Sequence, residues 1–366
     1  MNAYVEPRSG RLYPIAHPRW CSEDGLPLLV APQAGITRAA IETGERSLWR
    51  YAAALPVRVA DPVSLGEGMT PLVRRSLLGL DVLCKLEWFS PTASFKDRGA
   101  SVMLSILREQ GVREVLEDSS GNGGAAIAAY AAAAGMGARI LVPEGTRSAK
   151  TAQMRAFGAA LAFIPGDRQA TEDAARREAG SMFYASHNWQ PLFLEGTKTV
   201  AYELWEQGGF EAPDNVLIPT GAGSNVLGCD LGFSELLRAG EITRLPRLFA
   251  VQPEACAPIH AAHVARLPAP PPVERRATIA DGAAIARPVR GPEVLAALCR
   301  SGGGTVAVRE EEIARAQHRL AAAGLHVEPT AALPLAGLEQ LLGEGRITAG
   351  QRTVLLLTGS GLKSAS

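Results

Sequence analysis

The chain carries, at residues 91–99, the stretch Pro91-Thr92-Ala93-Ser94-Phe95-Lys96-Asp97-Arg98-Gly99. An apolar, strand-like run at 82–86 precedes it and a helical apolar pattern follows it. Lys96 is therefore predicted to lie at a helix N-terminus, where the positive end of the helix dipole disfavours an ammonium group. Beside Phe95, its pKa should be lowered enough for it to act as a nucleophilic, Schiff-base-forming amine. For this residue alone, a surface lysine paired with Asp97 is the alternative.

Two other stretches join a strand to a helix through small residues. They are Ser119-Ser120-Gly121-Asn122-Gly123-Gly124 and, after the apolar run at 215–218, Pro219-Thr220-Gly221-Ala222-Gly223-Ser224-Asn225. Such loops present backbone N–H groups in front of a helix N-terminus and so hold anions. Neither matches GxxxxGK[ST] or GxGxxG, and each alone fits an ordinary turn. Together with an activated lysine, they indicate a phosphorylated aldehyde cofactor, pyridoxal phosphate.

Seven motifs, between residues 65 and 363, closely resemble those of threonine synthases, which are fold-type II pyridoxal-phosphate enzymes of the tryptophan synthase beta-like superfamily. They are Gly66-Glu67-Gly68-Met69-Thr70-Pro71-Leu72, residues 91–99, residues 119–124, Glu195-Gly196-Thr197-Lys198-Thr199, residues 221–225, Glu328-Pro329-Thr330-Ala331-Ala332, and Leu357-Thr358-Gly359-Ser360-Gly361-Leu362-Lys363. The set is more specific for the superfamily than for the reaction, because sister enzymes share most of it.

The resemblance implies a carbon–oxygen lyase of amino-acid biosynthesis that converts O-phosphohomoserine to threonine and phosphate. The alternative is β-elimination or β-replacement on a serine, threonine or O-phosphoserine type of substrate, as in dehydratases or cysteate-synthase-like enzymes. A non-catalytic regulator that binds the cofactor or an amino acid is a second alternative, and the intact lysine and both glycine loops argue against it.

The resemblance also assigns residues to the cofactor. Lys96 is the expected catalytic residue, which holds the cofactor's aldehyde and moves protons at the substrate's Cα and Cβ. Thr358 is expected at the pyridine nitrogen, where a neutral hydroxyl favours β-chemistry over transamination. An ordinary turn hydroxyl and plain core packing are the alternatives for Thr358 and Phe95. The expected cofactor-binding set is Phe95, Lys96, Asn122, Gly221, Ala222, Gly223, Ser224, Asn225 and Thr358.

The expected substrate-binding residues combine hydroxyls, an amide and one ammonium. Hydroxyls beside a helix N-terminus suit a carboxylate, and helix capping is the alternative for each of them. His187 is a candidate to line the pocket together with Asn188, and a structural role is the alternative for it. The set is Thr70, Ser119, Ser120, Asn188 and Lys198.

One departure from the family concerns the substrate's phosphate. Threonine synthases usually carry Asn-Pro-Tyr-Arg-Leu-Glu-Gly, in which the arginine binds the phosphate, but this chain has Phe193 at that position. Losing a bidentate ligand is not neutral, so we expect weaker phosphohomoserine binding that Phe193→Arg would improve, unless another cation compensates. The stretch 278–282 resembles the dehydratases. The compensating cations considered are Lys198, Arg98, Lys150 and Arg147.

The composition is that of a globular enzyme. The 366 residues contain 37 Lys plus Arg and 37 Asp plus Glu, so no net charge favours nucleic acid or an anionic membrane. No apolar run reaches the roughly 20 residues of a membrane span. The five cysteines are scattered and form no CxxC pair, so we expect no metal site. We expect the protein to be cytoplasmic. The expected partners are an amino-acid substrate and a second copy in a homodimer.

Alternation of short apolar strands with helical segments predicts an α/β fold with two three-layer domains and mostly parallel sheets. Strands are predicted at 82–86, 115–118, 139–142, 160–164, 215–218, 248–251 and 354–357, and helices at 149–157, 169–178, 197–207 and 309–323. The expected division is an N-terminal extension at 1–60, a small domain at 90–186, and a large cofactor-binding domain made of 61–89 plus 187–366.

Overall fold

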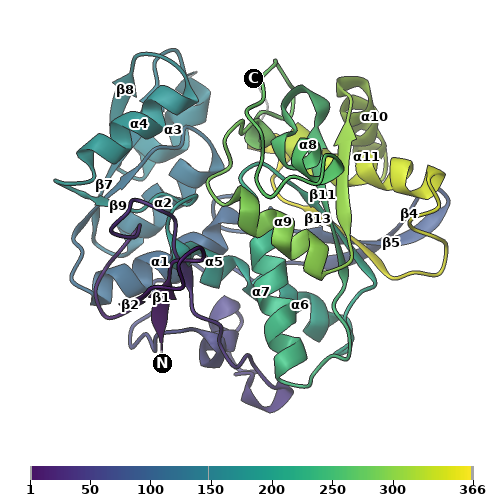
Figure 1. Ribbon diagram of the computed structural model, residues 1–366, viewed down its shortest axis with the longest axis horizontal. Coiled ribbons are helices and arrows are strands. Elements are labelled where there is room, and N and C mark those ends of the chain that lie inside the picture. The colour runs from purple at the N-terminus through teal and green to yellow at the C-terminus, as the bar shows by residue number, and fades with distance from the viewer. Residues whose placement is uncertain (1, 147, 364–366) are drawn as a thin grey trace.

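The computed structural model describes residues 2–146 and 148–363, which form three sheets (Figure 1). The largest has six strands in the order β12-β11-β10-β13-β5-β4, and only β4 runs antiparallel to its neighbour. Its strands are β4 (Leu72–Leu77), β5 (Leu80–Leu86), β10 (Asn215–Pro219), β11 (Arg247–Pro253), β12 (Gly304–Val308) and β13 (Thr353–Leu357).

Helices cover both faces of this sheet because side chains on successive strand residues point to opposite faces. Val216 and Ile218 pack with one group of helices, whereas Leu217 packs with another. The first group comprises α6 (Thr199–Gln207), α7 (Ser224–Arg238), α8 (Pro258–Val264) and α9 (Gly291–Arg300). The second comprises α10 (Glu310–Ala322) and α11 (Pro329–Gly343).

The second sheet is wholly parallel, with strand order β8-β7-β6-β9. Val115 and Ile140 face helices on one side, and Leu116 and Leu141 face α4 on the other. Its strands are β6 (Glu114–Glu117), β7 (Gly137–Pro143), β8 (Ala160–Ile164) and β9 (Phe183–Tyr184). Its helices are α1 (Lys96–Glu109), α2 (Asn122–Ala133), α3 (Ser148–Ala156) and α4 (Arg168–Glu178).

The N-terminal segment, residues 2–60, contains the third sheet, of order β2-β1-β3. Its Tyr4 and Leu28 share a core with Leu104 of α1, and Trp49 Nε1 donates to Ser101 Oγ at 3.0 Å. The segment contains β1 (Ala3–Val5), β2 (Leu12–Pro14), β3 (Leu29–Val30), η1 (Arg38–Ala40) and η2 (Leu48–Ala54).

The fold class is confirmed: two layered α/β bodies with mostly parallel sheets lie side by side (Figure 1). The domain boundaries at residues 60, 89 and 186 stay a prediction. The helix predicted at 197–207 corresponds to α6, which begins at Thr199; a further helix, α5 (Pro191–Thr197), precedes it and meets it at Lys198. In the two larger sheets, the strands β4, β9 and β12 were not predicted. The remaining elements are η3 (Glu254–Cys256), η4 (Asp281–Ala283) and η5 (Gly361–Lys363).

Candidate active site

Lys96 begins α1, as predicted, and the segment after β13 fixes the turn before it. Phe95 N donates to Thr358 O at 3.1 Å, and Ser360 N donates to Ala93 O at 3.2 Å. Because α1 belongs to the smaller sheet and β13 to the larger one, Lys96 lies where the two bodies meet.

The surroundings of Lys96 favour a neutral amine. Its Nζ lies 4.7 Å from the centroid of the Phe95 ring and 5.6 Å from that of Phe193. Desolvation lowers the pKa of Lys96 to about 7; Glu117 opposes this shift, and Arg168 adds to it. At neutral pH, about half of such amines are unprotonated. A nucleophilic lysine is the chemistry that this geometry supports.

The alternative of an ion pair between Lys96 and Asp97 is wrong. The Asp97 carboxylate instead accepts hydrogen bonds from the backbone N–H of Thr92, at 2.7 Å, and from the Thr92 hydroxyl. Burial raises the pKa of Asp97 to about 7. Asp97 therefore closes the turn ahead of α1 and leaves the Lys96 amine without a carboxylate partner among the described residues.

The 221–225 loop has the features of a phosphate cradle. Gly223 has a φ of 92° and no room for a side chain, since a Cβ there would lie 2.3 Å from Val294 Cγ2. Among the described residues, no protein group accepts the backbone N–H groups of Gly221, Ala222 and Gly223. These groups precede the N-terminus of α7, and the buried Asn225 Nδ2 also has no partner in the described part of the chain. Such donors fit a phosphate group.

The 119–124 loop begins α2 and lies against His187. A Cβ on Gly123 would lie 2.6 Å from His187 Nδ1, so the residue must be glycine for the histidine to pack there. Ser119 Oγ accepts the backbone N–H of Gly121 at 3.3 Å, as a turn hydroxyl would. Ser120 is half-buried, and its proposed role at the substrate carboxylate stays a prediction.

Asn122 is held by a carboxylate that was not among the expected site residues. Its Nδ2 donates to both carboxylate oxygens of Glu328 at 3.1 Å. Burial raises the pKa of Glu328, although Asn122 and nearby Lys363 oppose the shift. A Cβ on Gly359 would lie 2.2 Å from Glu328 Oε1, so Glu328 is enclosed between α2 and the segment after β13. The sequence signal that could have identified Glu328 as a site residue was its place in the motif 328–332.

Glu117, which was overlooked, pairs with His187 near Lys96. His187 Nδ1 and Glu117 Oε1 are 3.1 Å apart, and the backbone N–H of His187 donates to Glu117 Oε2 at 3.1 Å. Burial raises the pKa of Glu117; burial and the charge of Lys96 hold that of His187 well below its usual value. A neutral imidazole that donates from Nδ1 keeps a lone pair on Nε2. Neighbouring Asn188 is buried, and its role stays a prediction.

Thr358 directly follows β13 and is buried, and its carbonyl oxygen accepts the backbone N–H of Phe95 next to Lys96. The stretch 278–282 contributes to η4 and lies against the 221–225 loop: a Cβ on Gly221 would lie 3.0 Å from Gly282 O. The dehydratase-like residues are therefore part of the same site. The role of Thr358 at a ring nitrogen stays a proposal.

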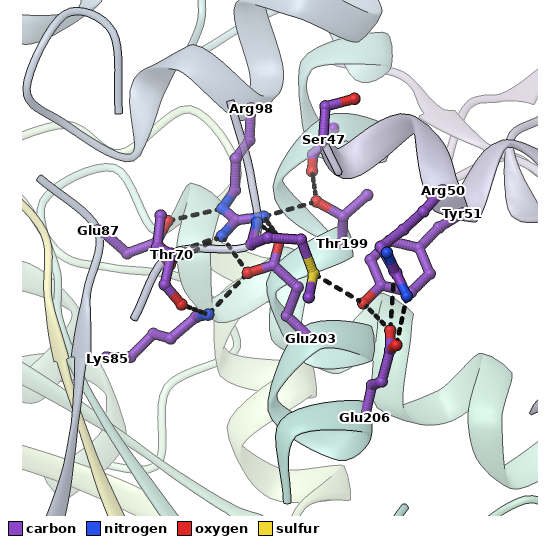
Figure 2. Close-up of polar contacts among 12 residues, drawn as sticks. Ser47, Arg50, Tyr51, Thr70, Lys85, Glu87, Arg98, Thr199, Glu203 and Glu206 are labelled. Atoms are coloured by element: carbon purple, nitrogen blue, oxygen red, sulfur yellow. Dashed lines mark hydrogen bonds and ion pairs between the residues drawn. The ribbon is translucent and has the colours of Figure 1, made fainter. Parts of the chain in front are cut away.

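Thr70 belongs to a buried ion network that anchors α1 (Figure 2). Its hydroxyl donates to Glu87 Oε1 at 2.6 Å and accepts from Arg98 Nη2 at 3.2 Å. Arg98 also pairs with Glu87 and Glu203, and Lys85 pairs with Glu203 at 2.7 Å. The Thr70 hydroxyl is thus engaged by protein groups, and its contact with substrate stays a prediction.

Lys198 was expected to bind substrate, and its surroundings contradict that. It is fully buried, and its Nζ donates to Ala54 O and Glu235 Oε1 at 2.9 Å and lies 2.5 Å from Glu195 Oε2. Two hydrogen bonds and the ion pair with Glu195 therefore hold this buried ammonium between helices α5 and α7, away from solvent.

The same reasoning removes Arg98 as a substitute cation, because Glu87 and Glu203 surround its guanidinium. Arg147 and the side chain of Lys150 lie outside the described residues. Phe193, at the position of the missing arginine, is buried, with its ring centroid 5.9 Å from that of His187.

The remaining groups limit other chemistries within the described part of the chain. No cluster of three or more His, Cys, Asp or Glu side chains there is placed to hold a metal ion. All five cysteines are free thiols, and burial raises the pKa of Cys84 to about 12 and those of Cys229 and Cys256 above the ordinary value. None of the described helices is both long and apolar enough to span a bilayer.

A desolvated lysine at the junction of two α/β bodies, together with a glycine-rich loop whose backbone N–H groups have no described acceptor, is typical of fold-type II pyridoxal-phosphate enzymes. Residues 63–359 match the profile of the family described as pyridoxal-phosphate dependent enzyme. The chain belongs to this family.

Curated relatives include two archaeal threonine synthases. That of Methanocaldococcus jannaschii is 38% identical over 87% of this chain and 81% of its own length. That of Methanosarcina acetivorans is 36% identical over 87% of this chain and 80% of its own length. These relatives support a threonine-synthase-like, pyridoxal-phosphate-dependent lyase.

Solved structures with the same fold include enzymes that act on hydroxy amino acids. A threonine deaminase from the organism abbreviated T.th. is 29% identical, with a TM-score of 0.67 over 80% of this chain and 92% of its own. A fungal L-serine ammonia-lyase from Rhizomucor miehei has a TM-score of 0.70 over 80% of this chain and 94% of its own. At 23% identity, the second likeness shows the fold alone.

Proposed function

We propose that this enzyme converts O-phosphohomoserine and water to threonine and phosphate. One observation carries the proposal: Lys96 has a pKa near 7 and lies where the two α/β bodies meet, and the 119–124 and 221–225 loops begin helices α2 and α7, as expected from the threonine-synthase motifs. The 38% identical threonine synthase supports the same substrate.

The chain's own residues fit the proposed cofactor. We assign the phosphate to the N–H groups of the 221–225 loop, the aldehyde to Lys96 and the ring to the face of Phe95, with Asn122 and Thr358 at its polar edges. When bound, pyridoxal phosphate supplies an electron sink for bonds at the substrate's Cα. The proposal needs a base that works near neutral pH, and Lys96 meets this requirement.

In the proposed reaction, Lys96 accepts the proton from Cα and transfers protons at Cβ and Cγ. The bond from Cγ to the phosphate oxygen breaks, and phosphate leaves with that electron pair. The hydroxyl of a water molecule adds at Cβ, so the products together contain all atoms of the substrate and the water. Phe95, Phe193 and His187 surround the amine and keep bulk water from it.

A direct test compares four substrates with the cofactor-loaded enzyme: O-phosphohomoserine, O-phosphoserine, serine and threonine. Phosphate, threonine, ammonia and keto acid are measured together. We expect threonine and phosphate in equal amounts from O-phosphohomoserine, and at least a thousandfold loss of turnover in Lys96→Ala. Ammonia and keto acid from serine or threonine, without threonine synthesis from O-phosphohomoserine, would refute the proposed reaction.

A second candidate function, β-elimination on serine or threonine, rests on two observations. Phe193 replaces the expected phosphate ligand, and the dehydratase-like stretch 278–282 lies against Gly221. The same assay decides between the two functions, because only elimination releases ammonia. We also propose a homodimer in the cytoplasm; size-exclusion chromatography with light scattering and cell fractionation test these two points.

A further inference from the structure

Arg168 is a cation near Lys96 that the function above does not use. It is the first residue of α4, and its side chain reaches back to the end of β6, where Nη1 donates to the carbonyl oxygen of Asp118 at 2.6 Å and to Asp118 Oδ2. Asp118 immediately precedes the 119–124 loop. The guanidinium therefore lies at the edge of the sheet that carries this loop.

The two bonds of Arg168 leave one side of its guanidinium open. Both hydrogens of Nη1 are taken by Asp118, whereas, within residues 2–146 and 148–363, no protein acceptor lies within hydrogen-bond distance of Nε or Nη2. The Nε–Nη2 edge carries two parallel N–H groups, which match a carboxylate or phosphate in a fork-like pair. The side chain is 22% exposed, so a ligand can reach it.

Asp118, which holds Arg168, is itself held by a neighbouring side chain. The Tyr184 hydroxyl donates to Asp118 Oδ1 at 2.9 Å, so the same carboxylate is held by Tyr184 and holds Arg168. Trp20 packs edge-on against Tyr184, with centroids 5.2 Å apart. Glu172 is the other nearby acid, and it accepts the indole N–H of Trp189 at 3.0 Å. A guanidinium anchored at one nitrogen loses little freedom when its other edge binds a ligand.

The charge of Arg168 affects the pKa values of two residues at the proposed site. It lowers the pKa of Lys96 after the larger effects of burial and Glu117, and it also lowers that of His187. Lys198 and Arg98 are enclosed by their own carboxylates, whereas Arg168 is a described cation near Lys96 that keeps an open edge. Arg290 also has buried N–H groups without a partner in the described part of the chain, but it lies against the Trp189 carbonyl.

We propose that the Nε–Nη2 edge of Arg168 binds the phosphate ester of the amino-acid substrate, in place of the arginine that is absent at Phe193. This inference rests on the proposed function for the identity of the phosphate ester. It makes Arg168 a specificity-determining residue: it selects substrates whose side chain ends in a doubly charged oxyanion over neutral hydroxy amino acids.

The test measures preference rather than turnover. The cofactor-loaded enzyme is titrated with O-phosphohomoserine and with homoserine, and each Kd is read from the change in cofactor absorbance. A charge-assisted fork contributes about 1.5–3 kcal/mol, so Arg168→Gln and Arg168→Lys should each reduce the ratio of the two Kd values by roughly tenfold or more. The matched control is Arg177→Gln, an exposed arginine on the same helix, and it should leave the ratio unchanged.

Arg168→Lys retains a positive charge for Asp118 but lacks the fork, so it separates ligand binding from folding. A second measurement needs no variant: phenylglyoxal modification of Arg168 in the unmodified enzyme, followed by peptide mass spectrometry. O-Phosphohomoserine and inorganic phosphate should protect Arg168 at least several-fold, while homoserine should not, and Arg177 should react equally in all three cases.

The outcomes separate this inference from the proposed reaction. A phosphate preference that depends on Arg168, without threonine synthesis, retains the binding role and rejects the reaction. Threonine synthesis with an unchanged Kd ratio in a folded Arg168→Lys variant overturns the role of Arg168 and retains the reaction. Equal modification of Arg168 with and without phosphate also overturns it.

Discussion

Lys96 is a desolvated amine, and its pKa near 7 makes a prediction about stability. The unfolded chain holds this proton up to about pH 10.4, so between pH 7 and 10 the unfolded state binds more protons than the folded state. The free energy of unfolding therefore rises with pH through this residue, by at most about 1.4 kcal/mol per pH unit. Below pH 7 both states are protonated, and the desolvation cost is constant.

The matched measurement compares the cofactor-free enzyme with Lys96→Met in urea at pH 6 and pH 9. We expect the methionine variant to gain stability over the unmodified chain at pH 6 and to lose most of this advantage at pH 9. The difference between the proteins cancels the opposite titration of Asp97, whose raised pKa stabilises the folded state at low pH. An equal difference at both pH values would contradict the lowered pKa.

Phe193 leads to a second prediction, which reverses the expectation from the sequence that Phe193→Arg improves phosphohomoserine use. The side chain is buried, and a Cβ on Gly99 would lie 2.5 Å from its ring. An arginine there would be an unpaired buried charge beside the Lys96 amine, which costs about 3 kcal/mol or more. We expect Phe193→Arg to lose this stability in urea unfolding, whereas Phe193→Leu loses only about 1 kcal/mol. Unchanged stability with improved kcat/KM would restore the earlier expectation.

Sequence reasoning located residues with a chemical signature better than residues whose role depends on packing. Lys96 and the 221–225 loop were found because a lysine at a strand-to-helix junction and a glycine-rich loop are local patterns. Glu117 was overlooked although it ends an apolar strand, where a charged residue is unusual. Lys198 was misassigned, because its carboxylate partner Glu235 lies 37 residues away in the sequence.

Helix α1 is anchored by the ion network of Figure 2. Replacing a residue of this network should therefore lower the free energy of unfolding. Arg98, Lys85, Glu87 and Glu203 are all fully buried and sum to zero charge. Breaking such a group by removing one member leaves an uncompensated buried charge, which typically costs about 3–5 kcal/mol. Arg98 also follows Lys96 by two residues, so the network fixes the first turn of the helix on which the site depends.

We therefore predict that Arg98→Met lowers the free energy of unfolding in urea by about 3–5 kcal/mol. The matched control is Arg74→Met, because the Arg74–Asp81 pair spans 3.7 Å and its side chains are 71% and 64% exposed. That substitution should change stability by less than about 0.5 kcal/mol. Equal effects of the two substitutions would show that the network does not anchor α1.

The strands differ in how well their local sequence predicts them. Strands such as β10 and β13 were predictable, because both faces are buried and the sequence is continuously apolar. Strand β4 was not, since Arg74 and Arg75 interrupt its apolar pattern at the sheet edge. Strand β9 has only two residues, too few for any periodic signal.

For the whole molecule, the N-terminal segment contacts both α/β bodies. Gln110 Nε2 of the smaller body donates to Ile15 O at 2.6 Å, and Arg238 Nε of the larger body donates to Gln33 O at 2.9 Å. Trp20 packs edge-on against both Tyr184 and Trp189. No local pattern predicts these contacts, because they depend on the final arrangement of the two bodies.

We predict that Trp20→Ala lowers the free energy of unfolding by about 2 kcal/mol, since a half-buried aromatic residue loses part of the roughly 3–5 kcal/mol of a fully buried one. Because Tyr184 positions Asp118, the variant should also weaken binding of phosphate-bearing ligands. Phe89→Ala, at a 58% exposed position, is the control for both readouts. Unchanged urea unfolding and an unchanged Kd for O-phosphohomoserine would show that the N-terminal segment does not support the site.

The strand order of the large sheet has a consequence for biosynthesis. During translation, β5 and β10 emerge early, yet they become neighbours only through β13, which pairs with both. Until β13 leaves the ribosome, each exposes an unpaired edge that can associate with other chains. Thr358 and the segment that holds the Lys96 turn arrive with it. A nascent chain released before β13 should therefore be both prone to aggregate and unable to bind cofactor, so incomplete products cannot act as partly active enzymes.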